Sequence, residues 1–139
     1  MRTFQGIECD LDSVLLRTDY TDEGTWQRTL DAVTAAHGEE EFRAEFLPVE
    51  DPDWAGATEA EIRQIAAAEG SRIPEIFVVD AHALIAPHEV LVIGMKDNQG
   101  SFRCPAEDLW EPQNNLVLSN LDFEDFAAAV DDTGVYQGF

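Results

Sequence analysis

The sequence predicts a single α/β domain with a mixed sheet of four to five strands and flanking helices. Segments in which apolar residues repeat every second position alternate with segments in which they repeat about every 3.6 positions. The chain has 139 residues, 45% of them hydrophobic, which suits one domain with a core of its own. We assign residues 1–12 to an N-terminal lead-in and residues 13–139 to the domain.

The expected strands are short apolar runs bounded by turn residues. They lie at residues 13–18, 42–49, 75–80, 89–95 and 101–104. The third run is almost continuously apolar, which is typical of a central strand. The last two flank a polar turn and predict a hairpin.

Three helices carry start signals. Asp22 or Thr21 is expected to cap a first helix that reaches about residue 37. Thr58 followed three residues later by Glu61 predicts a capping box for a second helix. A last helix is expected to begin near Asp122.

The order of these elements fits several sheets, and one local detail favours a thioredoxin-like topology. Pro74 stands immediately before the third strand, where thioredoxin-like folds carry a cis-proline. An ordinary trans proline at the start of a strand is the alternative, and a doubly wound or ferredoxin-like sheet stays open. The loop after the first strand holds no CxxC pair, so thiol exchange is not expected.

The charge restricts the partners. The chain carries 29 acidic against 8 basic residues, a formal net charge of −21. Binding to nucleic acid or to an anionic membrane needs clustered Lys and Arg, and Lys96 is the only lysine. No apolar stretch is long enough for a leader or a membrane span. Cys9 and Cys104 lie far apart with no metal-binding spacing, so we expect reduced thiols, no cofactor and a cytoplasmic location.

Patterns spread over most of the chain resemble a known family. They comprise residues 17–22 with Trp26, the run 77–81, and a C-terminal pattern formed by residues 109–110, 114–116, 120, 122–124, 126–127, 134–135 and 138–139. Together they resemble a family of small acidic actinobacterial proteins catalogued as a domain of unknown function. The resemblance covers about residues 13–139 and implies a single domain without implying an activity.

The best enzyme-like signal is the pair Asp10 and Asp12. It resembles the first motif of haloacid-dehalogenase-type phosphatases, in which an aspartate nucleophile precedes an aspartate acid/base by two residues and magnesium bridges them to phosphate. Ser13 stands where that family has glycine, and the preceding segment is a poor buried strand. An exposed acidic segment leading into the first strand is the alternative interpretation.

Histidines near the third strand form a second constellation. Asp80, His82 and His88 could surround a divalent metal, although three residues on one loop are not a diagnostic spacing. A carboxylate that caps the local backbone beside two solvent-facing histidines is the commoner arrangement. His37 is expected to pack at the end of the first helix.

The interaction hypothesis rests on two loops in which an aromatic residue is surrounded by acids. The candidate partner-binding residues are Asp19, Tyr20, Asp22, Asp51, Asp53 and Trp54. Both loops follow strands, so parallel strands would bring them to one edge of the sheet. An aromatic anchor ringed by carboxylates suits a basic protein partner. Alternatively, Trp54 folds back over the core and the acids keep the protein soluble.

The sequence therefore predicts a non-catalytic acidic protein-binding module, such as an inhibitor or immunity-type protein, that engages a basic partner surface. One alternative is a magnesium-dependent phosphatase-like hydrolase that uses Asp10 and Asp12. Another is a structural subunit of an assembly, for which the C-terminal residues 135–139 would supply an apolar patch.

Overall fold

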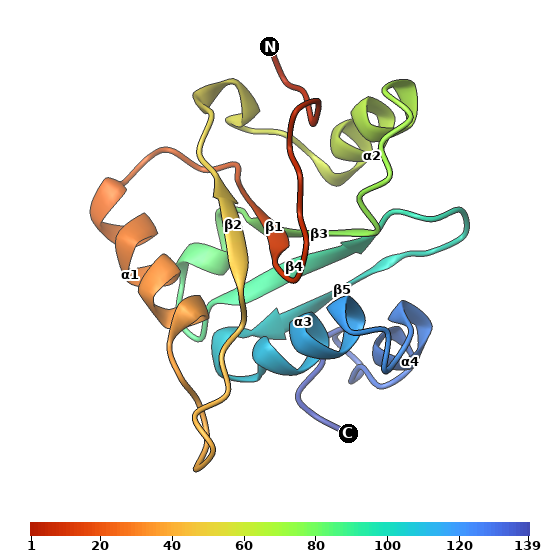
Figure 1. Cartoon of the computed structure of the whole chain (residues 1–139). Helices are drawn as coiled ribbons and strands as arrows, with labels where there is room; N and C mark the ends of the chain where they lie inside the picture. The colour runs from red at the N-terminus through yellow and green to blue at the C-terminus, as the bar shows by residue number, and fades with distance from the viewer.

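A five-stranded mixed sheet forms the centre of the protein in the computed structural model, which describes residues 1–139 (Figure 1). The strands are β1 (Ser13–Arg17), β2 (Phe46–Val49), β3 (Glu75–Val79), β4 (Glu89–Gly94) and β5 (Ser101–Pro105). Their spatial order is β2-β1-β3-β4-β5. The prediction of one α/β domain with a mixed sheet and flanking helices is confirmed.

Strand directions divide the sheet into two halves. β1 pairs in parallel with β2 and with β3, whereas β4 runs antiparallel to β3 and to β5. The thioredoxin-like topology is not confirmed, because that fold needs an antiparallel strand where β3 runs parallel to β1. The cis peptide bond lies between Ala86 and Pro87, after β3, and not before Pro74. The strand order together with the parallel direction of β3 is that of flavodoxin-like doubly wound sheets, ending here in an antiparallel hairpin.

Helices cover both faces of the sheet and create two cores. They are α1 (Glu23–Thr34), α2 (Glu59–Ala68), α3 (Trp110–Val117) and α4 (Phe123–Ala127). α1, α3 and α4 pack on one face around Phe77, while α2 packs on the other around Ile76 and Val78 (Figure 1). Successive β3 side chains alternate between the faces, so a nearly all-apolar strand serves both cores.

The capping predictions for the helices are confirmed. Asp22 accepts hydrogen bonds from the backbone N–H groups of Gly24 and Thr25, and Thr58 forms the capping box with Glu61. At the start of α4, the Asp125 side chain accepts a hydrogen bond from the backbone N–H of Asp122 at 2.8 Å. α3 has no side-chain cap and was not expected.

The second strand is shorter than predicted. Residues 42–45 lie outside β2, because the backbone of Phe42 pairs with His37 in a local bridge and its ring stacks on Trp110 at 4.5 Å. His37 in turn lies beyond the end of α1, and its Nε2 is 3.3 Å from the Ala32 carbonyl oxygen. The chain therefore turns back before β2 begins.

The two outer strands meet different neighbours. Pro48 is exposed within β2, where it has no N–H to offer. Along β5, the C-terminal segment pairs with Arg103, whose N–H donates to the Gly134 carbonyl while its own carbonyl accepts from the N–H of Tyr136. Tyr136 is buried, and Phe139 packs on its ring at 5.4 Å. In the segment considered as an apolar patch for assembly, Val135 and Tyr136 therefore pack on their own domain, whereas Phe139 is 74% exposed.

Candidate functional site

The loops after β1 and β2 lie at the same edge of the sheet, as the sequence predicts. We call this the carboxyl edge and define it as residues 17–23 together with residues 50–56. The N–H of Gly56 donates to the carbonyl of Thr18 at 2.8 Å, which ties the second loop to the first. Ligands of open α/β sheets usually bind at such an edge, in the crevice beside the first strand.

In this protein, Arg17 occupies that position. Its side chain is 4% exposed and forms ion pairs with Glu23 at 2.8 Å and with Glu50 at 3.4 Å. Its guanidinium lies over the ring of Tyr20 at 4.2 Å and near that of Trp26 at 4.9 Å. Stacked, ion-paired arginines of this kind fill space and fix neighbouring loops. The carboxyl edge is therefore closed.

The two aromatic residues proposed as anchors are not free at this edge. Tyr20 is partly buried on Arg17, its hydroxyl has no hydrogen-bond partner, and burial raises its pKa. Trp54 is fully buried and packs against Phe4 at 4.7 Å between their ring centroids. The hypothesis of an exposed Trp54 anchor is wrong, because Phe4 from the N-terminal segment covers the ring. Residues 1–12 thus contribute to the second core.

The predicted acids do converge at the carboxyl edge, and three of them also shape their own loops. One oxygen of each accepts a nearby backbone N–H: Asp19 from Thr21 at 2.9 Å, Asp22 from Gly24 at 2.9 Å and Asp51 from Asp53 at 3.0 Å. Hydrogen bonds from Thr25 lower the pKa of Asp22. Asp53 pairs with the N-terminal amino group.

The structure separates the second constellation. Asp80 binds the guanidinium of Arg103 through two hydrogen bonds of 3.0 and 2.7 Å, which lower its pKa despite its burial. His82 contacts Glu89 at 2.9 Å, and His88 Nδ1 lies 3.1 Å from the hydroxyl of Thr29. No group of three or more His, Cys, Asp or Glu side chains is arranged to hold a metal ion.

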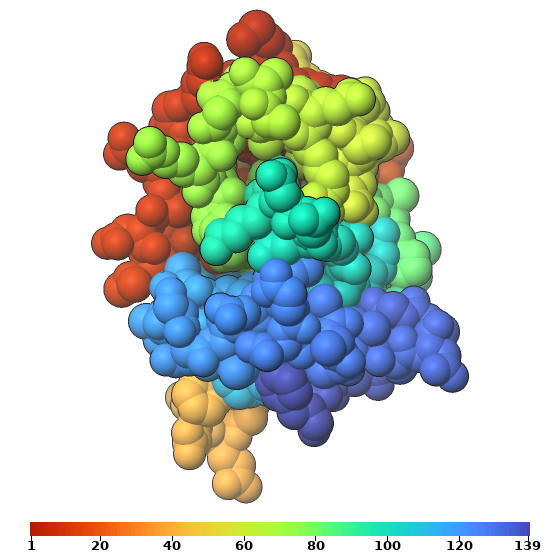
Figure 2. Space-filling model, turned by 90° about the vertical axis from the view of Figure 1, so that its right-hand side faces the viewer, coloured from red at the N-terminus to blue at the C-terminus, as the bar shows by residue number.

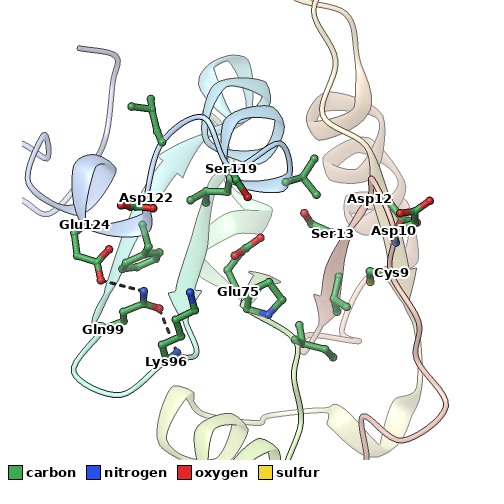
Figure 3. Close-up of a pocket in the computed structure, with 17 residues that line it drawn as sticks. Cys9, Asp10, Asp12, Ser13, Glu75, Lys96, Gln99, Ser119, Asp122 and Glu124 are labelled. Atoms are coloured by element: carbon green, nitrogen blue, oxygen red, sulfur yellow. Dashed lines mark hydrogen bonds between the residues drawn. The ribbon is translucent and has the colours of Figure 1, made fainter.

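The open site lies at the opposite edge, where β1 and β3 begin and β4 ends. We call it the amino-edge pocket. It is a cavity of about 460 Å³ bounded by the segment before β1, the start of β3, the β4–β5 turn and the α3–α4 connection (Figure 3). Figure 2 shows the face on which the N-terminal segment, this turn and the α3–α4 segment meet.

Glu75 lies at the centre of the amino-edge pocket. It is the first residue of β3 and only 7% exposed, and Figure 3 shows its carboxyl group directed into the cavity. Burial raises its pKa from 4.5 to about 7, and Lys96 opposes that rise only in part. The carboxyl group receives no hydrogen bond or ion pair. Buried carboxylates are nearly always paired, so this one is exceptional.

Neighbouring residues build the wall of the pocket. Gln99 accepts the N–H of Lys96 at 3.2 Å and donates to Glu124 at 3.0 Å, linking the β4–β5 turn to α4 (Figure 3). Gly94 leaves room for the Gln99 side chain in this turn, because a Cβ at position 94 would lie 2.6 Å from that side chain. Opposite, the buried Gln113 donates to the Ser13 hydroxyl at 3.1 Å and fixes α3 on β1.

Asp10 and Asp12 also line the amino-edge pocket. Asp10 is exposed, and Asp12 accepts its backbone N–H at 3.1 Å. Both precede β1, whereas the phosphatase motif follows its strand. The thiol of Cys9 opens onto the same cavity, and burial raises its pKa, as it does that of Cys104 in β5. Neither cysteine lies at the start of a helix, the position that activates a thiol.

Sequence reasoning missed Glu75. The available signal was a charged residue directly after Pro74, at the first position of a central apolar strand. A charge on a strand buried on both faces needs either a partner or a ligand.

Together, these features define a small α/β protein whose usual ligand edge is closed and whose open pocket lies at the other end of the strands. The chain belongs to the family described as Domain of unknown function (DUF6924), whose model matches residues 12–139. A comparison with curated proteins found no match. No helix combines the length and the apolar character needed to cross a membrane.

Proposed function

We propose that this chain is a non-catalytic acidic binding module that engages a basic protein surface through its carboxyl edge. One observation carries the proposal: two loops bring together six acids, Asp19, Asp22, Glu23, Glu50, Asp51 and Asp53, while the adjacent bases are already paired. Glu23 and Glu50 hold Arg17, and Glu61 holds Arg2 at 2.9 Å.

Long-range attraction supports this function. The formal net charge is −21 with all eight basic residues included, and four of the eight basic side chains form ion pairs with carboxylates of the same chain. A surface with one dominant sign of charge accelerates encounter with an oppositely charged partner. A nucleic-acid-binding channel of a toxin or enzyme would offer such a partner, and carboxylates would stand where phosphates bind.

Because Trp54 is buried, affinity must come from the carboxylates and from the accessible part of Tyr20. Salt screens the attraction between these carboxylates and a basic partner. Neutralising the carboxylates by substitution therefore slows association. Two widely separated free thiols suit a reducing compartment, so the proposal includes a cytoplasmic location.

The test compares two double variants of equal charge. Asp51→Asn with Asp53→Asn neutralises the carboxyl edge, and asparagine retains the oxygen that caps the local turn. Glu39→Gln with Glu40→Gln removes the same charge from the exposed loop around residue 40, which projects from the body in orange in Figure 2. Immobilised proteins are exposed to cell extract at low and at high salt, and bound proteins are identified by mass spectrometry.

We expect a basic protein that the parent and the loop variant retain at low salt, that the edge variant loses, and that high salt releases. Equal retention by both double variants would show that only the overall charge matters and would contradict a role for the carboxyl edge.

A further inference from the structure

We propose that the amino-edge pocket is a binding site for an ammonium or guanidinium group carried on an apolar stem, with the Glu75 carboxylate as its anchor. The site lies at the opposite end of the strands from the carboxyl edge and goes beyond the function proposed above. Its test uses different variants, so either proposal can fail alone.

The state of Glu75 is the first argument. The residue is 7% exposed, and its carboxyl group is unpartnered and is directed into a cavity (Figure 3). Removing a carboxylate from water without a partner is costly, and native proteins rarely retain such a group. A cation entering the cavity supplies the missing partner through a charge-assisted hydrogen bond.

The charges that surround Glu75 determine the sign of the ligand. The pocket is lined by five acidic side chains and one basic one, Lys96. Asp10 and Asp12 come from the segment before β1, and Asp122 and Glu124 come from the start of α4. Phosphates and carboxylates would be repelled by this arrangement, whereas cations would be attracted.

The walls determine the rest of the ligand. Leu116 and Val117 of α3 and Phe123 of α4 provide apolar surface beside Glu75. About 460 Å³ lies within the range of small-molecule sites and exceeds the volume of a bare inorganic ion. A stem of several carbons fills this space while its charged end reaches the carboxylate.

Lys96 is an internal competitor. It is exposed on the β4–β5 turn, makes no ion pair with Glu75, and is the only cation that acts on the pKa of that carboxyl group. A second cation in the cavity would be repelled by Lys96. Replacing Lys96 should therefore strengthen ligand binding, in contrast to replacing Glu75.

Binding should also depend on pH. A cation pairs with ionised Glu75, whose pKa is about 7, so affinity should rise as the pH increases through 7. The other groups facing the site are Asp10, Asp12 and Cys9 before β1, Lys96 after β4, and Asp122 and Glu124 on α4. Hydrogen bonding from Gln99 lowers the pKa of Glu124, and burial raises the pKa of the Cys9 thiol, so both shifts lead away from the pKa of Glu75.

The experiment titrates the full chain with n-butylammonium and with Nα-acetyl-arginine amide, followed by backbone amide chemical shifts. Neutral n-butanol and anionic butanoate are the matched controls for the stem. Each cation is added at about pH 6 and about pH 8, on either side of the Glu75 pKa. The protein variants are Glu75→Gln, Lys96→Met and, as a charge control outside the pocket, Glu39→Gln.

We expect both cations to shift amides around the pocket and to bind more tightly at the higher pH. Glu75→Gln should weaken binding at least tenfold, Lys96→Met should strengthen it several-fold, and Glu39→Gln should leave it unchanged. Tighter binding of the blocked arginine assigns the site to a side chain of a protein partner, and tighter binding of the alkylammonium assigns it to a free amine. Equal binding of n-butanol, unchanged binding by Glu75→Gln, or no binding of either cation would overturn the proposal.

Discussion

The two ends of the parallel strands each hold a buried charged residue, but only one of these residues has partners within the protein. At the carboxyl edge, the buried Arg17 is satisfied by two carboxylates, a backbone carbonyl and two aromatic faces. At the amino edge, the buried Glu75 has no partner and faces a cavity. One charge completes the packing, whereas the other is left for something outside the chain.

This contrast shows that the fold does not by itself locate the site. Doubly wound sheets usually bind ligands beyond the carboxyl ends of their strands. Here a single stacked arginine closes that crevice, and the hairpin formed by β4 and β5 brings Lys96 and Gln99 to the other end. The location of a binding site in this fold therefore depends on particular side chains.

The largest expected effect tests whether the carboxyl edge is closed. Trp54→Ala should lower the free energy of unfolding by about 3–5 kcal/mol, because it removes a large aromatic ring from the core. Urea unfolding measures the change. Tyr20→Phe is the control at the same edge and should change stability by less than about 0.5 kcal/mol, since the hydroxyl that it removes has no partner. A stable Trp54→Ala protein would mean that the ring does not hold the edge together.

The next effect tests the cost of leaving Glu75 unpaired. Its pKa is about 7 in the folded protein and near 4.5 in the unfolded chain, so the folded state binds the proton more tightly. The contribution of Glu75 to the stability of the parent should fall as the pH rises from 4.5 to 7 and then stay constant. Glu75→Gln should therefore gain up to about 3 kcal/mol at pH above 7 and almost nothing at about pH 4.

The free energy of unfolding in urea is measured for the parent and the variant at these two pH values. The difference between the two proteins isolates the contribution of the Glu75 carboxyl group from that of all other titrating groups. A gain of the same size at both pH values would show that packing rather than charge separates the two proteins. Such a result would also contradict the contrast between the satisfied charge of Arg17 at the carboxyl edge and the unpaired charge of Glu75 at the amino edge.

The smallest expected effect concerns Asp10 and the phosphatase alternative. Asp10 is exposed and precedes β1, so millimolar magnesium should leave the melting temperature unchanged in the parent and in Asp10→Asn. Differential scanning fluorimetry checks this. A magnesium-dependent rise that disappears in Asp10→Asn would assign a metal site to the amino edge and favour the hydrolase alternative.

Local signals in the sequence were sufficient for most of the fold. The periodicity located the strands, and the caps at Asp22 and Thr58 located α1 and α2 because a cap depends only on neighbouring residues. α3 escaped detection because Trp110–Val117 is polar and contains Pro112, which is tolerated only in a first helical turn. The topology also could not be derived, because local periodicity leaves the direction of β3 relative to β1 undetermined.

The candidate site was predicted less well, because its properties arise from distant contacts. The alternation of acids and aromatics placed Tyr20 and Trp54 at one edge, but the burial of Trp54 depends on Phe4, fifty residues away in the chain. The burial of Glu75 likewise requires α3, α4 and the β4–β5 turn to meet over the start of β3. Neither arrangement leaves a local pattern.

The outer strands have a consequence for assembly. An unpaired strand edge invites another chain to add a strand, which leads to aggregation. The C-terminal segment already occupies the backbone groups of Arg103 on β5, and Pro48 deprives β2 of a donor in mid-strand. Both margins of the sheet therefore resist extension by a further copy, which disfavours polymerisation through the backbone.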